Sequence, residues 1–230
     1  MLKINEKISV IMPAYNEARN IGRVLKVVKE CDFIDEVILI DDGSSDKTVE
    51  VAQGFRDKRL RIIQHATNQG KGAAMATGIQ KAKNDLLLFL DSDLVGLKPE
   101  HMLKILSPIV FTGEADLSLG VFGLKKIFRT TPSKVANRIF PSISGQRAIY
   151  KKCLPPIERI RKSRYGVDLL ITRSVPKTRR VIIALEGLSQ IIKENKTTDP
   201  VEVIANRIKM YQEVAKTLKE ILEDERESRH

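Results

Sequence analysis

The sequence is poor in cysteine, histidine and aromatic residues. Its 230 residues include two cysteines, three histidines and no tryptophan, and aromatic residues make up 5% of the chain. Cys31 and Cys153 are far apart and match no metal-ligand spacing, which favours two reduced thiols over a disulfide framework. No histidine lies near a cysteine, so a zinc site is not expected.

Long apolar runs are also missing. No stretch approaches the roughly 20 apolar residues that a membrane-spanning helix needs, and residues 1–7 lack the apolar core of a signal peptide. We therefore expect a cytoplasmic protein that meets a membrane only peripherally, at its inner face. Hydrophobic residues make up 42% and charged residues 30%, which is typical of one folded domain with a substantial core.

Acidic residues are scarce in one part of the chain. Between positions 121 and 180 sixteen lysines and arginines stand against Glu158 and Asp168, a surplus of +14 within a net charge of +11. Such a region attracts nucleic acid, an anionic membrane surface or a phosphorylated small molecule. Nucleic acid is the least favoured of the three, because few aromatic residues interleave with the basic ones and no nucleic-acid motif is present.

Apolar strand patterns alternate with helical patterns along the first half of the chain. The predicted strands span residues 8–13, 36–40, 60–64, 86–94 and 115–121, and the predicted helices span residues 18–29, 73–83 and 99–110, with a further helix starting near residue 48. This alternation predicts an α/β fold with right-handed crossovers and a mainly parallel sheet flanked by helices.

The apolar run that starts at Leu86 ends in two acids, Asp91 and Asp93. The carboxyl end of a strand is where open α/β sheets bind ligands. Two carboxylates this close repel each other unless a cation lies between them, and Mg²⁺ or Mn²⁺ suits such a pair. The alternative is a solvated turn in which one of the acids caps the following helix.

Two common nucleotide-binding motifs are absent. Residues 13–18, after the first strand, contain no glycine, so the dinucleotide-binding fingerprint is missing. Residues 68–72, which read Asn-Gln-Gly-Lys-Gly, do not have the spacing of a P-loop.

Four segments, residues 8–17, 37–48, 68–74 and 91–93, resemble in order and spacing the nucleotide-sugar-binding half of glycosyltransferase family 2, which has the GT-A fold. Within the family, the pattern is most similar to glucosyl-3-phosphoglycerate synthase-like and dolichol-phosphate-mannose synthase-like enzymes. The resemblance implies transfer of a hexose from a donor of the UDP-glucose or GDP-mannose type, with Mg²⁺ or Mn²⁺ as cofactor. The acceptor would be phosphorylated or lipid-linked.

The resemblance also implies roles for single residues. The residues expected to bind the donor nucleotide are Pro13, Ala14, Tyr15, Glu17, Asp42, Lys71, Asp91 and Ser92. Asp42 would meet the base and Lys71 the base or the diphosphate, while Asp91 and Asp93 would bind ribose and metal. Two simpler alternatives stay open, namely that Tyr15 only packs and that Lys71 is only solvated.

The acceptor side is expected in residues 144–150 and 165–171. By the same resemblance, Gly145, Gln146 and Arg147 would bind the acceptor, Asp168 is the candidate base, and Asp93 is the second residue expected to be catalytic. Relatives often bring a late histidine to the metal, but no histidine occurs between positions 101 and 230, and Gln190 is the candidate replacement. A nucleotide-sugar-binding regulator that lacks the chemistry is therefore the alternative.

The last part of the chain predicts an amphipathic helix that starts at Asp199. Its apolar seam consists of Val201, Ile204, Ile208, Tyr211, Ala215, Leu218 and Leu222. Such a seam packs on its own domain or pairs with a second copy as a homodimer. We thus expect a GT-A domain over residues 1–195, with a donor half to about 95 and an acceptor half after it, followed by the helix and a charged tail over residues 196–230.

Overall fold

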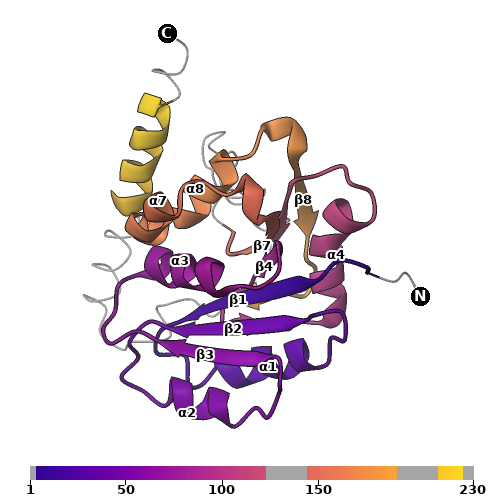
Figure 1. Ribbon diagram of the computed structural model, residues 1–230, viewed down its shortest axis with the longest axis vertical. Helices are drawn as coiled ribbons and strands as arrows, with labels where there is room; N and C mark the ends of the chain where they lie inside the picture. The colour runs from indigo at the N-terminus through magenta and orange to yellow at the C-terminus, as the bar shows by residue number, and fades with distance from the viewer. Residues whose placement is uncertain (1–3, 123–143, 191–211, 225–230) are drawn as a thin grey trace.

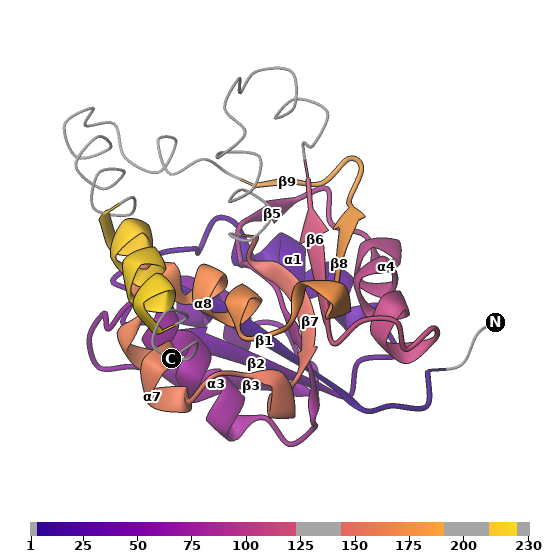
Figure 2. The same ribbon diagram turned by 90° about the horizontal axis from the view of Figure 1, so that it is seen from above.

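The computed structural model describes residues 4–122, 144–190 and 212–224. Its centre is a seven-stranded sheet with the strand order β3-β2-β1-β4-β7-β6-β8. The strands are β1 (Ile8–Ala14), β2 (Glu36–Asp41), β3 (Leu60–Gln64), β4 (Leu86–Phe89), β6 (Leu117–Val121), β7 (Gln146–Tyr150) and β8 (Arg180–Ala184). A separate antiparallel pair joins β5 (Leu94–Val95) to β9 (Ser189–Gln190), and Figure 2 shows these two strands side by side.

The prediction of a mainly parallel sheet is confirmed. Strands β3, β2, β1 and β4 run parallel, as do β6 and β8, whereas β7 is antiparallel to both of its neighbours. The sheet takes strands from both expected halves of the domain. The predicted strand over residues 86–94 was too long, because the chain leaves β4 after Phe89 and starts β5 at Leu94.

Helices cover both faces of the sheet (Figure 1). They are α1 (Ile21–Lys29), α2 (Thr48–Gln53), α3 (Lys71–Lys81), α4 (Pro99–Val110), α7 (Ile157–Lys162) and α8 (Val167–Arg173), with short 3₁₀ turns η2 (Lys151–Cys153), η3 (Arg164–Gly166) and η4 (Lys177–Arg179). Helix α3 starts two residues before its predicted beginning, which places Lys71 in its first turn.

Alternate residues of each central strand enter two different cores. In β1, Val10 and Met12 pack with the apolar sides of α1, α2 and α4, while Ile11 packs with α3, α7 and α8. All three residues have no exposed surface. A parallel sheet that is buried on both faces explains why its strands read as continuous apolar runs in the sequence. No helix among the described residues is both long and apolar enough to cross a membrane.

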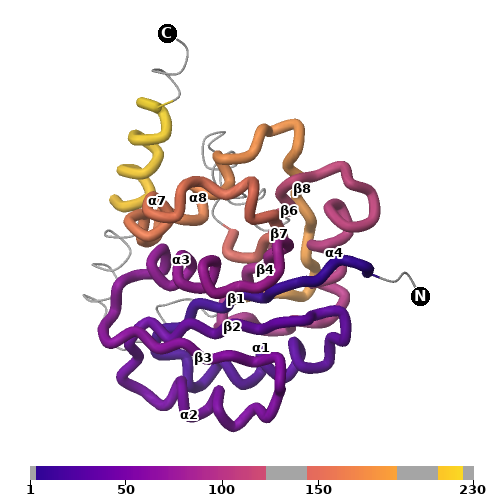
Figure 3. The backbone as a smooth tube through the Cα atoms, viewed as in Figure 1, coloured from indigo at the N-terminus to yellow at the C-terminus, as the bar shows by residue number. Residues whose placement is uncertain are grey.

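Residues 212–224 form a helix that packs on the domain, beside α7 (Figure 3). Val214, Leu218 and Ile221 contact the core that contains α7 and α8, and a Cβ atom on Gly166 would overlap Thr217. Packing on the domain, one of the two expected arrangements, therefore holds for this part.

The predicted seam is wrong in this helix at two positions. Ala215 and Leu222 are exposed, and Leu222 keeps 43% of its surface. Thr217 and Ile221 are buried instead. A heptad count does not determine which face of a helix is buried, because that depends on how the helix packs against its domain. Residues 201–211 of the seam lie outside the described residues, and pairing with a second copy stays a prediction.

Candidate active site

Strand directions bring the chemically active residues to one edge of the sheet. The carboxyl ends of β1, β2 and β4 meet there, because these strands are parallel. Strand β7 runs the other way, and its register sets Arg147 opposite Phe89 and Gln146 opposite Gly120. The segment that starts β7 therefore lies beside the loop that follows β4.

Three side chains surround the two acids after β4. Asp91 Oδ1 accepts a hydrogen bond from Lys71 Nζ at 3.0 Å, and its Oδ2 accepts one from Gln146 Nε2 at 2.7 Å. Gln190 Nε2 donates to Asp93 Oδ1 at 2.7 Å and to Asp91 Oδ2 at 3.3 Å. The structure therefore brings Asp91, Asp93, Lys71, Gln146 and Gln190 together, and Gln146, expected on the acceptor side, contacts Asp91.

Gly145 makes room for this cluster. A Cβ atom at this position would overlap the carboxylate of Asp91. The backbone before β7 can therefore approach the acid only because the residue is glycine.

Lys71 lies between two carboxylates. Its Nζ is 3.0 Å from Asp91 Oδ1 and 2.9 Å from Asp168 Oδ2. Burial alone would lower the pKa of Lys71, but the two carboxylates outweigh it and hold the pKa above its ordinary value. Burial likewise favours a raised pKa at Asp91, yet Lys71 and Gln146 outweigh it and the pKa is lowered. Lys71 and Asp91 are therefore both charged at neutral pH, and the solvated-lysine alternative is wrong.

Arg147 is buried instead of facing an acceptor. Its exposed fraction is 0%, and its guanidinium donates to Asp168 Oδ1 at 2.9 Å and to the backbone oxygen of Asp168 at 2.7 Å. It also donates to the backbone oxygen of Ser144 and to Thr172. The expectation that Arg147 binds the acceptor is therefore corrected, because β7 directs its side chain under α8.

Both carboxylate oxygens of Asp168 form ion pairs with basic side chains. Oδ1 pairs with Arg147 and Oδ2 with Lys71, and the residue is 4% exposed. A general base needs an oxygen that can reach the acceptor hydroxyl. In this arrangement, Asp168 fixes the position of Lys71, and its role as the base stays a prediction.

Asp42 holds the loop that leads to Lys71. Its Oδ1 accepts hydrogen bonds from the backbone of Gln69 at 3.0 Å and from His65 Nδ1 at 2.8 Å, and its Oδ2 accepts one from the backbone of Gly70 at 2.7 Å. His65 Nε2 in turn lies 3.0 Å from Thr77 Oγ1. His65 was not among the residues expected in the site, although its position directly after a predicted strand could have indicated it. The contact of Asp42 with a base stays a prediction.

The loop after β1 is tied to the acids from the other side. Ser92 Oγ donates to the backbone oxygen of Pro13 at 2.9 Å. Tyr15 is 47% exposed, whereas Ala14 and Glu17 are buried, with 3% and 6% exposed. The ring of Tyr15 is thus available to a ligand and does not simply fill the core.

The donor atoms at this edge fit a hard divalent cation. Among the described residues, no three histidine, cysteine, aspartate or glutamate side chains form a metal-binding group. Asp91 and Asp93 do offer carboxylate oxygens, and the amide of Gln190 offers its oxygen if it turns over. Mg²⁺ and Mn²⁺ accept such a set and fill their other positions with water and phosphate oxygens.

Comparisons with known proteins identify the family. A family model described as "Glycosyl transferase family 2" matches residues 9–158. The chain is 42% identical over 89 residues to an uncharacterized glycosyltransferase of Haemophilus influenzae, a match that covers 37% of this chain and 36% of the relative. It is 32% identical over 157 residues to undecaprenyl-phosphate 4-deoxy-4-formamido-L-arabinose transferase of Proteus mirabilis, with 63% and 46% covered.

A solved structure supports the fold. Glucosyl-3-phosphoglycerate synthase of Mycobacterium tuberculosis, crystallised with Mn²⁺, UDP and glucosyl-3-phosphoglycerate, aligns with a TM-score of 0.72 at 19% identity over 94% of this chain and 80% of that chain. The chain spans less than half the length of the two curated relatives. Because the family model covers well over half of the residues, the chain belongs to glycosyl transferase family 2.

Proposed function

We propose that the chain transfers a hexose from a nucleoside diphosphate sugar to a phosphate-bearing acceptor. The observation that carries this proposal is the cluster of Asp91, Asp93, Lys71 and Gln190 at the carboxyl edge of the sheet. Two carboxylates and one ammonium group there complement a diphosphate together with a divalent cation.

Each residue of the cluster has a distinct task in this proposal. Asp91 and Asp93, with the amide oxygen of Gln190 once its amide turns over, would hold Mg²⁺ or Mn²⁺, which would supply positive charge to the leaving diphosphate. Lys71 adds a second positive charge from the start of α3. The charge of Lys71 stabilises the transition state more than the ground state, because negative charge grows on the leaving group as the sugar departs. Asp168 and Arg147 keep the lysine in place.

The acceptor is proposed from charge and from the relatives. The surplus of +14 over residues 121–180 favours an anionic acceptor, although Arg159, Arg164 and Arg179 already pair with acids on the surface. The names of the relatives include both an undecaprenyl phosphate and a phosphoglycerate acceptor. The shared chemistry is a phosphate group, and peripheral binding to an anionic membrane is expected only for the lipid-linked case.

Product analysis with radiolabelled donors tests the proposal. UDP-glucose and GDP-mannose are each incubated with 3-phosphoglycerate or with a polyprenyl phosphate, with and without Mn²⁺. We expect labelled product in one acceptor arm, only when the cation is present. Binding of nucleotide without transfer in any arm would instead support the regulator alternative. Co-sedimentation with anionic vesicles at low and high salt then distinguishes a lipid-linked from a soluble acceptor.

A further inference from the structure

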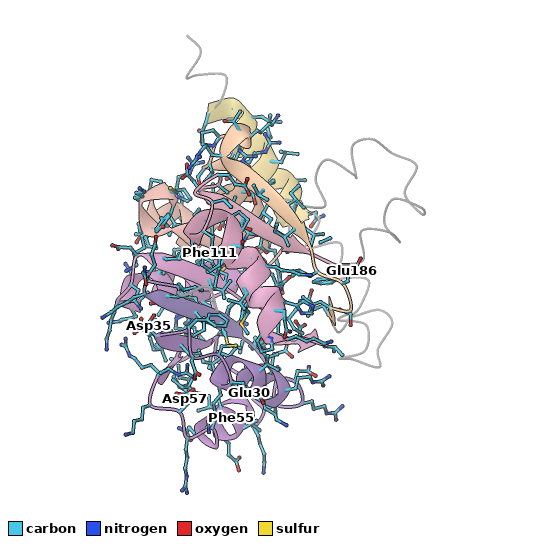
Figure 4. All side chains as sticks on the ribbon, turned by 90° about the vertical axis from the view of Figure 1, so that its right-hand side faces the viewer. Glu30, Asp35, Phe55, Asp57, Phe111 and Glu186 are labelled. Carbon is cyan, nitrogen blue, oxygen red and sulfur yellow. The ribbon has the colours of Figure 1, made fainter. Side chains whose placement is uncertain are left out.

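His101 connects the start of α4 to the loop that follows β8. It is buried, with 5% exposed. Its Nδ1 accepts a hydrogen bond from the backbone of Lys98 at 3.2 Å, and its Nε2 lies 3.0 Å from the backbone oxygen of Glu186. Because Nδ1 is an acceptor, the neutral ring carries its proton on Nε2, which donates to Glu186. Figure 4 labels Glu186 in this loop.

The same loop delivers Gln190 to the acids. Strand β9 pairs with β5 so that Gln190 lies opposite Leu94, the residue directly after Asp93. The two backbones also approach closely between Gly96 and Gly187, since a Cβ atom on Gly96 would overlap the oxygen of Gly187. The register of this short pair therefore sets where the amide of Gln190 lies.

Strand β9 cannot hold that register alone. It contains two residues, and both are exposed. An isolated pairing of this length is marginal in water. The loop before β9 is held in place by the buried side chains of Leu185 and Leu188, which are 2% and 5% exposed, and by the hydrogen bond from His101 to Glu186.

We propose that His101 is a positioning residue of the Asp91–Asp93 site, acting through Glu186 and β9 on Gln190. The part of this inference that concerns cation binding rests on the proposed function. The part that concerns the position of the loop is independent of that function, because it can be measured in the protein without any ligand.

Two substitutions separate the two hydrogen bonds of the ring. His101→Asn keeps an acceptor near the position of Nδ1 for Lys98 but is too short to reach Glu186. His101→Gln carries a donor near the position of Nε2 for Glu186 but loses the acceptor for Lys98. A residue that only stabilises the start of α4 would make His101→Gln the more damaging change, whereas a positioning residue makes His101→Asn the more damaging one at the site.

Hydrogen exchange in the metal-free proteins measures the loop, and titration of UDP or GDP with Mn²⁺ measures the site. In His101→Asn, we expect the amides of residues 186–190 to exchange about five- to tenfold faster, as for the loss of one buried hydrogen bond. The Mn²⁺-dependent affinity for nucleotide should fall in His101→Asn and stay near the native value in His101→Gln.

The inference would be overturned if the amides of residues 186–190 exchanged faster in His101→Gln than in His101→Asn. It would also be overturned if they exchanged at the native rate in both variants. If the native protein shows no Mn²⁺-dependent binding of nucleotide, the proposed function fails, and the exchange result alone then decides the role of His101.

Discussion

The ammonium nitrogen of Lys71 lies 2.9 Å from Asp168 Oδ2, although 97 positions separate the two residues in the sequence. This contact joins the first turn of α3 to the first turn of α8 across the edge of the sheet. Arg147 pairs with the other oxygen of the same carboxylate. Three residues from three distant segments thus form one buried charge network beside Asp91.

A double-mutant cycle should show that Lys71 and Asp168 depend on each other. Lys71→Met leaves Asp91 and Asp168 without their shared cation, so we expect a loss of stability that Asp168→Asn partly relieves. The coupling energy should be about 1–3 kcal/mol, as for groups in one network. Urea unfolding of the native protein, both single variants and the double variant at pH 7 gives this value. A coupling near zero would contradict the network.

Arg147→Met should be among the most destabilising single changes at the site. It leaves Asp168 buried without one of its two cations, and breaking a buried pair typically costs about 3–5 kcal/mol. Asp168→Leu added to Arg147→Met should restore part of the loss, because the unpaired charge is then gone. Native stability of Arg147→Met, measured by urea unfolding, would show that the guanidinium is not buried as described.

Gly145→Ala should weaken the site without unfolding the protein. The new methyl group would displace the carboxylate of Asp91, so Mn²⁺-dependent nucleotide binding should fall. Gly22→Ala in α1 is the matched control, because a Cβ atom there meets only ordinary contacts, the nearest at 3.6 Å from the side chain of Phe55. That control should raise stability by about 0.5–1 kcal/mol, as for glycine replaced within a helix. Calorimetric titration and thermal unfolding compare the two variants, and native Mn²⁺-dependent binding by Gly145→Ala would contradict the close approach.

The donor side of the site could be predicted from the sequence because its signals are local. Each of Tyr15, Asp42 and Asp91 follows an apolar strand, and parallel strands bring their carboxyl ends together. These local patterns therefore predict that the acids after β4 and the lysine at the start of α3 lie at one edge.

The acceptor side could not be predicted in the same way. Strands β7 and β9 are short, and the antiparallel direction of β7 follows from long-range pairing that no local pattern encodes. That direction is what buries Arg147 beneath α8. Likewise, the helix over residues 212–224 buries Thr217 instead of Ala215, because contact with Gly166 decides its face.

Asp57 should make the stability of the protein depend on pH in acid. Hydrogen bonds from Arg59 at 2.8–3.1 Å lower its pKa, and they outweigh the opposing effect of burial. A lowered folded-state pKa gives stability that is complete above the unfolded value, about 3.9, and is lost as the pH falls through the folded value.

Asp57→Asn should therefore lower the free energy of unfolding by about 1–2 kcal/mol at pH 7 and change it very little at the most acidic pH measured. Asp85→Asn, at an exposed site before β4, serves as the control. Urea unfolding from pH 7 to pH 2 provides the comparison. A difference between native protein and Asp57→Asn that stays constant with pH would contradict this account of the Arg59 contact.

The central claim is that Asp93 holds a divalent cation for a nucleoside diphosphate. Isothermal titration of UDP and of GDP, each with and without Mn²⁺, tests it in the native protein, in Asp93→Asn and in Asp85→Asn, which lies at the opposite end of β4. We expect Mn²⁺ to strengthen nucleotide binding in the native protein and in Asp85→Asn, but not in Asp93→Asn, whose melting temperature without ligand should stay near the native value. Equal Mn²⁺-dependent affinity in Asp93→Asn and the native protein would contradict the claim.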